Sequence, residues 1–253
     1  MTFGVMFHHF HNKYHSKSQG SISSNQLTKI IKYLRKKYIL LNAKDYLEKI
    51  KNKNIKSNEI CLTFDDCLKS QFNIAVPILK KEKIKVFFFI YSGIFKKNYN
   101  NLEIFRDFRN SKFKNLEDFY THFFTIFEKY YNKKFKNFKK KFKKNYLEQY
   151  SFYTLSDRKF RFCRDRILNK KSFDKLMFIM MRDRKYNYKA SQKKLFMTKK
   201  NIKSLIRKEN IVGLHSDSHP ANIYSLNFKK QYSEYKRNYN FLLNNFDLEA
   251  DTM

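Results

Sequence analysis

"ICLTFDDCLKS", residues 60–70, is an apolar run that ends in two adjacent carboxylates, Asp65 and Asp66. The run has the length and composition of a buried strand in a parallel sheet. In α/β folds the carboxyl ends of parallel strands form the rim where ligands bind, so both acids are expected at that rim. Adjacent side chains of a strand point to opposite faces, and these two can share one site only if the strand turns into its loop here.

The segments around this run alternate between strand-like and helix-like patterns, which predicts a mainly parallel sheet with helices packed outside it. Ser24 or Asn25 is expected to cap the first helix. Pro77 is expected either to kink its helix or to mark where that helix begins. The predicted strands are 3–7, 38–41, 59–64, 85–92 and 210–216, and the predicted helices cover 27–34, 43–50, 72–83, 198–208 and 227–244.

Between about residues 96 and 197 the pattern changes to one that is rich in Lys, Phe and Tyr, lacks Gly and Pro, and indicates several helices. We therefore predict a basic, mainly helical insertion at 96–197 in an α/β domain made of 1–95 and 198–253. Within it, residues 132–150 repeat apolar side chains every three or four positions among lysines, which predicts an amphipathic basic helix. Its apolar positions are Phe135, Phe138, Phe142 and Tyr146.

The chain carries 55 basic and 22 acidic residues, a formal net charge of +33. Such a charge favours an anionic partner, which could be nucleic acid, a phospholipid surface or a phosphorylated substrate. The composition offers another explanation, because it is rich in Lys, Asn, Ile, Phe and Tyr and poor in Ala, Gly and Pro. AT-rich coding produces this joint bias. Most of the charge is therefore interpreted as lysine on the solvated surface. Nucleic acid is disfavoured as a partner because no zinc-finger, RNP, helix-turn-helix or basic-zipper pattern is found, although lysines among aromatic residues would suit nonspecific binding of single strands.

The cysteine count and the N-terminal sequence bear on location. Three cysteines without a CxxC spacing indicate neither a disulfide framework nor a cysteine zinc site, and they favour a reducing compartment. The N-terminal residues lack the pattern of a secretory signal, and no apolar run is long enough to cross a bilayer. The sequence therefore predicts a cytoplasmic protein, free or peripheral on the inner face of a membrane.

A second group of polar side chains follows a strand in "GLHSDSHP", residues 213–220. His215 and His219 have the i, i+4 spacing that places two imidazoles on one face of a helical turn, where both can bind one ion. Two nitrogens and one carboxylate would leave coordination positions open, as in catalytic sites. Taken alone, each pattern has an ordinary explanation, because an Asp pair often caps a helix and an HxxxH spacing is often incidental.

Both patterns together resemble the polysaccharide deacetylases, the NodB-type carbohydrate esterases of carbohydrate esterase family four. Their first motif, TFDDG, is similar to "LTFDDC" at 62–67, and their second, H(S/T)xxHP, is similar to "HSDSHP" at 215–220. Many members also open with a strand that ends in Tyr-His, which "VMFHHF" resembles with His8 in place. The resemblance covers about residues 3–95 and 197–246.

This resemblance implies a (β/α) barrel of the polysaccharide-deacetylase type, with Asp66, His215 and His219 as metal ligands and Asp65 as catalytic base. His8 would bind substrate. The implied reaction is hydrolysis of an acetyl group, N-acetyl rather than O-acetyl, from an amino sugar in a polysaccharide or surface-glycan precursor. The implied cofactor is a divalent ion, for which zinc fits the mixed nitrogen and oxygen ligands, as other divalent transition metals would.

Two departures from the family pattern leave alternatives open. Cys67 replaces the motif's glycine, so a positive φ there would strain the turn, and the thiol could ligate the metal or oxidise. The late Leu-x-His segment that carries the family's general acid has no match in this sequence. We therefore predict an incomplete barrel with an exposed edge. The chain could be a truncated, split or decaying version of the family, or a partner could complete it.

The alternatives concern both the function and the insertion. Instead of an enzyme, the chain could be an inactive glycan- or metal-binding protein, or a basic module for membrane surfaces or nucleic acid. The insertion could be a lid over the sugar site, drifted filler, or a clamp that binds an anionic membrane surface through residues 132–150.

Overall fold

The computed structural model describes residues 3–96, 100–220 and 222–253 of the 253-residue chain. The chain forms two compact units, unit 1 from Met1–Asn100 and Gln192–Met253, and unit 2 from Asn101–Ser191. The predicted domain boundaries stand at 95/96 and 197/198, whereas the compact units divide at 100/101 and 191/192. Residues 97–99, at the start of the predicted insertion, lie outside the described residues.

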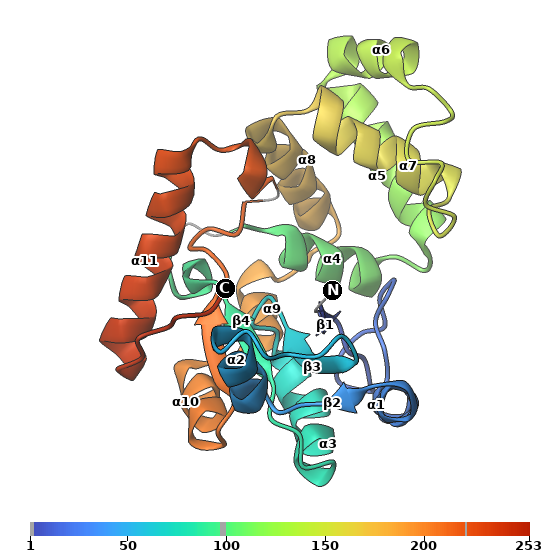
Figure 1. The fold of residues 1–253 in the computed structure, drawn as a ribbon. Helices are drawn as coiled ribbons and strands as arrows, with labels where there is room; N and C mark the ends of the chain where they lie inside the picture. Colours follow the sequence, from blue (N-terminus) through green and yellow to red (C-terminus); the bar gives the residue numbers. More distant parts are fainter. Residues whose placement is uncertain (1–2, 97–99, 221) are drawn as a thin grey trace. The chain divides into compact units, whose positions relative to one another are not determined.

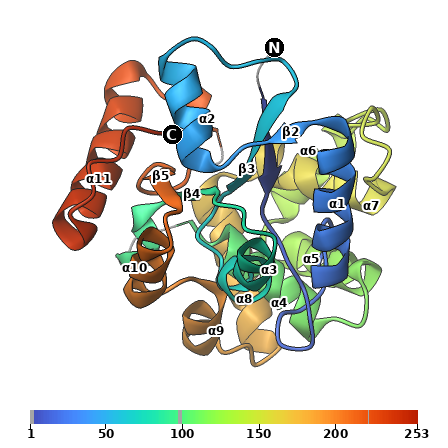
Figure 2. The same ribbon diagram turned by 60° about the horizontal axis from the view of Figure 1, so that its bottom comes forward.

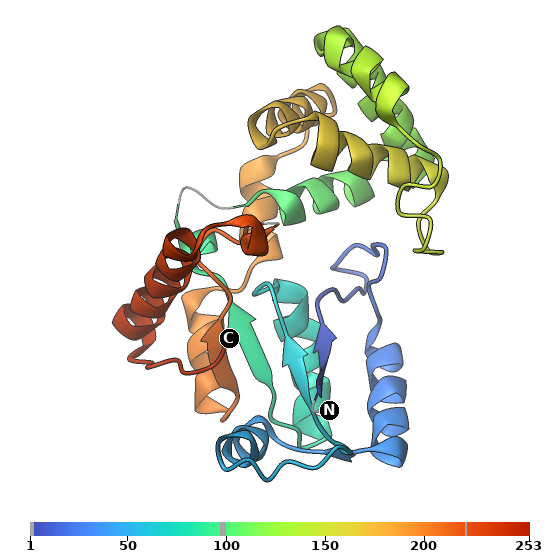
Figure 3. The same ribbon diagram turned by 45° about the horizontal axis from the view of Figure 1, so that its top comes forward.

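Unit 1 is built on a parallel sheet, which confirms the predicted α/β class (Figure 1). Its strand order is β1-β3-β4-β5, and β2 pairs with the start of β3. Figure 3 shows the strands from the side, running in the same direction. Because β3 lies between neighbours and is covered on both faces, nearly its whole length is buried, as is usual for parallel sheets. The strands are β1 (Phe3–Phe7), β2 (Ile39–Leu40), β3 (Glu59–Phe64), β4 (Phe87–Ile90) and β5 (Ile211–Leu214).

The C-terminal residues run beside the last strand of this sheet. The backbone N–H of Leu214 in β5 donates to the carbonyl oxygen of Thr252 at 2.8 Å. A Cβ on Gly213 would lie 2.6 Å from the Thr252 hydroxyl oxygen, so glycine allows this close approach. The exposed edge that was predicted after β5 is therefore covered in part, because the returning chain takes up a backbone donor of that edge.

The helices of unit 1 pack around the sheet, and Figure 2 shows α1, α3 and α10 beside its strands. Helix α2 packs with Ala43 against Cys61 of β3 and Phe87 of β4. The first helix is capped by Ser23, one residue before the predicted cap, because Ser23 and Gln26 form a reciprocal capping box. Pro77 lies in the first turn of α3, directly after a π-helical turn at Gln71–Ala75. Ala75 before α3 has right-handed helical angles, so Pro77 does not mark the start of the helical run and lies just after a local widening within it. The helices are α1 (Ser24–Lys37), α2 (Ala43–Lys51), α3 (Val76–Lys81), α10 (Lys199–Arg207) and α11 (Phe228–Phe246), with 3-10 turns at Ser92–Phe95 and Ile223–Ser225.

Unit 2 consists of helices joined by turns, and its core is aromatic. The rings of Phe123 and Phe160, whose centroids lie 4.8 Å apart and nearly perpendicular, are at its centre. Its buried phenylalanines are Phe105, Phe108, Phe119, Phe123, Phe127, Phe135, Phe138, Phe160 and Phe173. Its helices are α4 (Leu102–Lys112), α5 (Leu116–Tyr130), α6 (Asn132–Lys141), α7 (Leu155–Phe162) and α8 (Lys170–Asp183), with a π-helical turn at Cys163–Ile167 and with α9 (Tyr188–Leu195) across the boundary between the units.

The amphipathic helix predicted over 132–150 is wrong in length and in what its apolar face contacts. Helix α6 ends at Lys141, and residues 142–150 form turns. Phe138 stacks on Phe124 with ring centroids 5.5 Å apart, and Phe135 meets Phe127 edge-on at 5.4 Å. An interfacial helix must expose its apolar face to enter a membrane. Because this face is buried inside unit 2, it does not provide the membrane-binding surface that the sequence suggested.

A search of the helices in the described residues finds none with the length and apolarity needed to span a bilayer.

Candidate metal centre

The two acids of the opening stretch lie where β3 ends and the backbone turns. The Asp65 N–H still donates to the Phe7 carbonyl oxygen at 3.1 Å, as the last link to β1. Asp66 and Cys67 then adopt left-handed conformations, with φ of 74° and 56°. This turn is the condition under which adjacent side chains of a strand can face one site. Both carboxylates are largely buried, with 7% of Asp65 and 4% of Asp66 exposed.

Three contacts from elsewhere in unit 1 hold this turn. The side-chain amide of Gln71, which is fully buried, donates to the carbonyl oxygen of Asp65 at 2.5 Å and to that of His8 at 2.9 Å. The N–H of Met197 donates to the Cys67 carbonyl oxygen at 2.9 Å. Left-handed conformations cost non-glycine residues about 1–2 kcal/mol each. These contacts supply the constraint that keeps the turn in place.

The second group of polar residues lies in a loop after β5, and the helical turn expected for it is wrong. Ser216 and His219 have φ of 65° and 52°, which no α-helical turn contains. The His219 N–H donates to the Ser216 hydroxyl at 3.2 Å, and this contact closes the loop. The loop also receives two backbone hydrogen bonds from the residues after β4, from Ser92 N–H to the Ser216 carbonyl oxygen and from Gly93 N–H to the Asp217 carbonyl oxygen.

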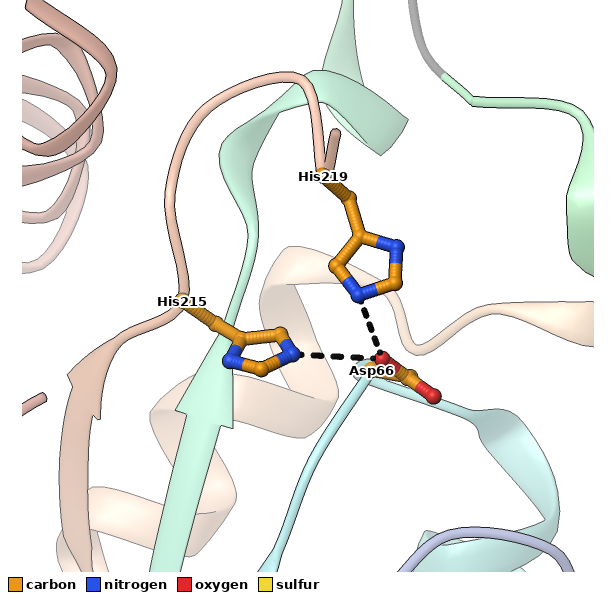
Figure 4. A group of neighbouring side chains, drawn as sticks. All are labelled: Asp66, His215 and His219. Carbon is orange, nitrogen blue, oxygen red and sulfur yellow. Dashed lines mark ion pairs between the residues drawn. The ribbon is translucent and has the colours of Figure 1, made fainter. Parts of the chain in front are cut away.

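The two histidines converge on one carboxylate oxygen (Figure 4). Oδ1 of Asp66 lies 3.3 Å from Nε2 of His215 and 3.1 Å from Nε2 of His219. The buried Tyr91, at the end of β4, stacks on the His219 ring with centroids 4.9 Å apart and so limits its rotation. His8 Nε2 lies 3.8 Å from Oδ2 of Asp66 and 3.9 Å from Oδ2 of Asp65. The structure therefore brings the predicted site residues together, while the roles assigned to them stay predictions.

Burial and neighbouring charges shift the pKa values of the two carboxylates in opposite directions. Burial alone would raise the pKa of Asp66, but the side chains of His215 and His219 outweigh it and hold that pKa well below its usual range. Burial raises the pKa of Asp65, and the Asp66 charge acts in the same direction against the opposing effect of His215 and His8. Asp66 is therefore the carboxylate that stays ionised, and Asp65 is the one that gains a proton more readily.

The residues at this centre fit a small divalent cation. Asp66 Oδ1 is buried, and within the described residues no well-oriented hydrogen-bond donor satisfies it. The ligand atoms of Asp66, His215 and His219 all lie within 4.8 Å of one another. A tetrahedral zinc site with bonds of about 2.0–2.2 Å places its ligand atoms about 3.3–3.6 Å apart, close to the 3.1 and 3.3 Å that separate the oxygen from the two nitrogens. One carboxylate with two imidazoles is also a ligand set found in catalytic zinc sites.

The Cys67 thiol does not belong to this group. Its side chain is buried, and burial raises the pKa of the thiol. A neutral thiol is a poor metal ligand, since the thiolate is the form that binds. Asp66, His215 and His219 form a group of mutually close ligand atoms at this centre, and the Cys67 sulfur is not part of it.

Known proteins resemble this chain in sequence over part of its length and in fold. The family model for polysaccharide deacetylases matches residues 52–141, which include Asp65 and Asp66. Two solved structures each have a TM-score of 0.50. IcaB from Ammonifex degensii is 13% identical, and the match covers 99% of this chain and 74% of IcaB. A de-N-acetylase from Aggregatibacter actinomycetemcomitans is 11% identical, and the match covers 98% of this chain and 76% of that protein. The chain is thus similar to the polysaccharide deacetylase family in sequence over residues 52–141 and in fold over nearly its whole length.

At identities this low, the solved structures establish the fold alone, and that fold is the (β/α) barrel type of this family. No protein with a curated description matches the chain in sequence. The matched family consists of hydrolases of the polysaccharide-deacetylase type. The resemblance inferred from "LTFDDC" and "HSDSHP" is confirmed.

Sequence reasoning missed two residues that shape this candidate site. Gln71 ties the turn after β3 to the end of β1, and Tyr91 supports the His219 ring. Gln71 directly precedes the helix predicted at 72–83, and Tyr91 lies in the strand predicted at 85–92, where ordinary packing roles are expected for both. No local signal distinguishes them, because each acts on a segment distant in the sequence.

Proposed function

We propose that this polysaccharide deacetylase removes N-acetyl groups from amino sugars of a polysaccharide or surface-glycan precursor, with zinc as the cofactor. The observation that carries the proposal is the convergence of Asp66, His215 and His219 on one point, with Asp65 beside them. The Aggregatibacter structure of the same fold is described as a de-N-acetylase, which favours N-acetyl over O-acetyl groups. The cytoplasmic location expected from the sequence stays a prediction.

The two carboxylates would divide the work. Asp66, whose low pKa keeps it ionised, would hold the cation together with the two histidines. A divalent cation bound there would polarise the acetyl carbonyl and lower the pKa of water. Asp65 would accept the proton of the attacking water, and its raised pKa suits a base that must accept protons near neutral pH. His8, whose side chain is about one-third exposed beside both carboxylates, would contact the sugar.

The test is acetate release from an N-acetylated oligosaccharide by the full chain with added zinc, before and after Asp65→Asn. Loss of a general base lowers turnover about 10²–10⁴-fold. Zinc binding is expected to stay stoichiometric, because Asp65 is not among the proposed ligands. Asp45→Asn is the matched control, since Asp45 is an exposed acid in the first turn of α2, and it should leave turnover unchanged.

Two outcomes would contradict the proposal in different ways. A chain that binds zinc stoichiometrically but releases no acetate would be a metal-binding relative without hydrolase activity. An Asp65→Asn variant with full turnover would show that another group accepts the proton.

A further inference from the structure

Two buried polar residues of α11 contact the loop that carries both histidines. Asn238 is fully buried and Glu234 is 7% exposed, one helical turn apart on the face of α11 toward β5. Residues of these types are rarely buried without a structural or functional reason. Both side chains form hydrogen bonds to the loop that carries His215 and His219.

Asn238 joins the start of this loop to the end of the neighbouring strand. Its Oδ1 accepts from the His215 N–H at 2.8 Å, and its Nδ2 donates to the Ile90 carbonyl oxygen at 3.0 Å. One planar amide thus fixes the backbone of His215 relative to β4. The His215 side chain begins at this backbone, so its position follows from the same contact.

Glu234 takes up the backbone donors between the two histidines. Its Oε2 accepts from the N–H of Asp217 at 3.1 Å and of Ser218 at 2.7 Å, and its Oε1 accepts from the Ser218 hydroxyl at 3.1 Å. Because the loop is not helical, these N–H groups need partners outside it. Hydrogen bonds to an ionised acceptor are about twice as strong as neutral ones.

Basic side chains balance the charge of this arrangement. Arg237 donates to Glu234 Oε1 at 2.5 Å and to Asp217 Oδ2 at 2.9 Å. Lys96 donates to the other oxygen of Asp217 at 2.5 Å. Both carboxylates are therefore paired, as buried charges must be to remain stable.

We propose that Glu234 and Asn238 are positioning residues that set the distance between the imidazoles of His215 and His219, and so determine the affinity of the centre for its cation. The proposal rests on the proposed function, because it takes the cation site to be the one described above. Neither residue reaches the cation position itself, since each acts through the loop backbone. Groups that orient metal ligands in this indirect way change metal affinity about 10–100-fold when they are removed.

The test compares Glu234→Gln and Asn238→Ala with Asn240→Ala in the full chain. Asn240 is an exposed asparagine of the same helix, which makes it the matched control. Zinc affinity, measured by competition with a chromophoric chelator, is expected to fall about 10–100-fold in the first two variants and to stay unchanged in the third. The visible absorption spectrum of bound cobalt should also change in the first two, since it reports ligand geometry.

A readout without metal separates this proposal from the proposed function. Amide hydrogen exchange of the metal-free chain should quicken at residue 215 in Asn238→Ala, because that N–H loses its acceptor. It should quicken at residues 217 and 218 in Glu234→Gln, because a neutral amide oxygen is a weaker acceptor than a carboxylate. If the unaltered chain binds no zinc, the proposed function fails and the exchange rates still decide the positioning role. Unchanged exchange at these amides, or unchanged zinc affinity with an unchanged cobalt spectrum, would overturn the proposal. Glu234→Gln keeps the shape of the side chain, so it gives an answer even if Asn238→Ala does not fold.

Discussion

Unit 1 buries many polar side chains at the carboxyl ends of its strands, whereas the buried residues of unit 2 are mainly apolar, with phenylalanine the commonest. Seven buried polar residues of unit 1 lie in or against the two loops of the metal centre, namely Asp65, Asp66, Gln71, Ser92, Asp217, Glu234 and Asn238. Others lie elsewhere, such as Glu59 at the start of β3, which pairs with Lys49. Burying such groups costs free energy unless they are hydrogen-bonded or paired. Their concentration in one place indicates a site, while the packing of unit 2 indicates a scaffold.

The two buried acids of unit 2, Glu103 and Asp157, have local structural explanations. Glu103 pairs with Arg106 one turn along α4, at 3.5 Å. Asp157 forms a capping box with Thr154 at the start of α7. Its Oδ1 also accepts a hydrogen bond from the Tyr120 hydroxyl, and burial raises the pKa of that tyrosine. A helix cap with one tyrosine partner needs no ligand. The buried polar groups of unit 1 are therefore more numerous and cluster at the metal centre, whereas those of unit 2 have structural roles.

The largest effect that would sharpen this comparison is expected from Asp66→Asn. Asparagine tolerates the left-handed backbone of this position, so the fold should persist. Its neutral oxygen is a much weaker ligand than a carboxylate, and zinc affinity should fall by more than the roughly 100-fold reached by groups that act indirectly. Calorimetric titration with zinc measures this change. Retention of full zinc affinity would mean that the converging side chains are not the metal ligands.

The next largest effect is expected in unit 2, on stability. Phe123 is fully buried and contacts the rings of Phe127, Phe160 and Phe173. Phe123→Ala should lower the free energy of unfolding by about 3–5 kcal/mol. Phe152→Ala, at a ring that is 63% exposed, should change it by less than about 1 kcal/mol. Urea denaturation followed by circular dichroism measures both.

These two variants should also differ in their effect on metal binding. Phe123→Ala is expected to leave stoichiometric zinc binding intact at temperatures where the variant is folded, because its contacts lie within unit 2. If zinc binding were lost together with stability, the separation between a scaffold and a site would be wrong.

The strands and the acids of unit 1 could be predicted from the sequence because their signals are local. A buried strand is one continuous apolar run, and Asp65 and Asp66 follow it directly. Their convergence with His215 and His219 was inferred from two family motifs, each of which follows a strand of one parallel sheet. Parallel topology then brings the ends of these strands to the same rim.

The shape of the histidine loop could not be predicted, because contacts distant in the sequence determine it. Spacing alone suggested a helical turn, but the loop is held by backbone donors at Ser92 and Gly93 and by acceptors on Glu234 and Asn238. Nothing between 213 and 220 indicates these partners.

The end of α6 was missed for a similar reason. The periodic pattern of 132–150 continues past Lys141, but Phe142 and Tyr146 both turn to pack on Phe162 of α7, with ring centroids 5.6 and 5.1 Å away. Leu147 then has a φ of 55°, which no helix contains. Packing against a later helix therefore overrode the helical periodicity.

The smallest predicted effect is on stability, and it depends on the backbone conformation at one buried cysteine in each unit. Cys67 of unit 1 is left-handed with φ of 56°, whereas Cys163 of unit 2 is right-handed with φ of −60°. Glycine at a right-handed helical position is less stable than alanine by about 1 kcal/mol, because it loses more backbone entropy on folding. At a left-handed position alanine keeps a Cβ strain of about 1–2 kcal/mol that glycine lacks. Cys67→Gly should thus be more stable than Cys67→Ala, and the order should reverse at Cys163. Both variants at one site lack the buried thiol, so comparing Gly with Ala at that site cancels its loss. Urea denaturation of the four variants then measures the backbone contribution to the free energy of unfolding. If Ala were more stable than Gly at both sites, the turn after β3 would carry no strain.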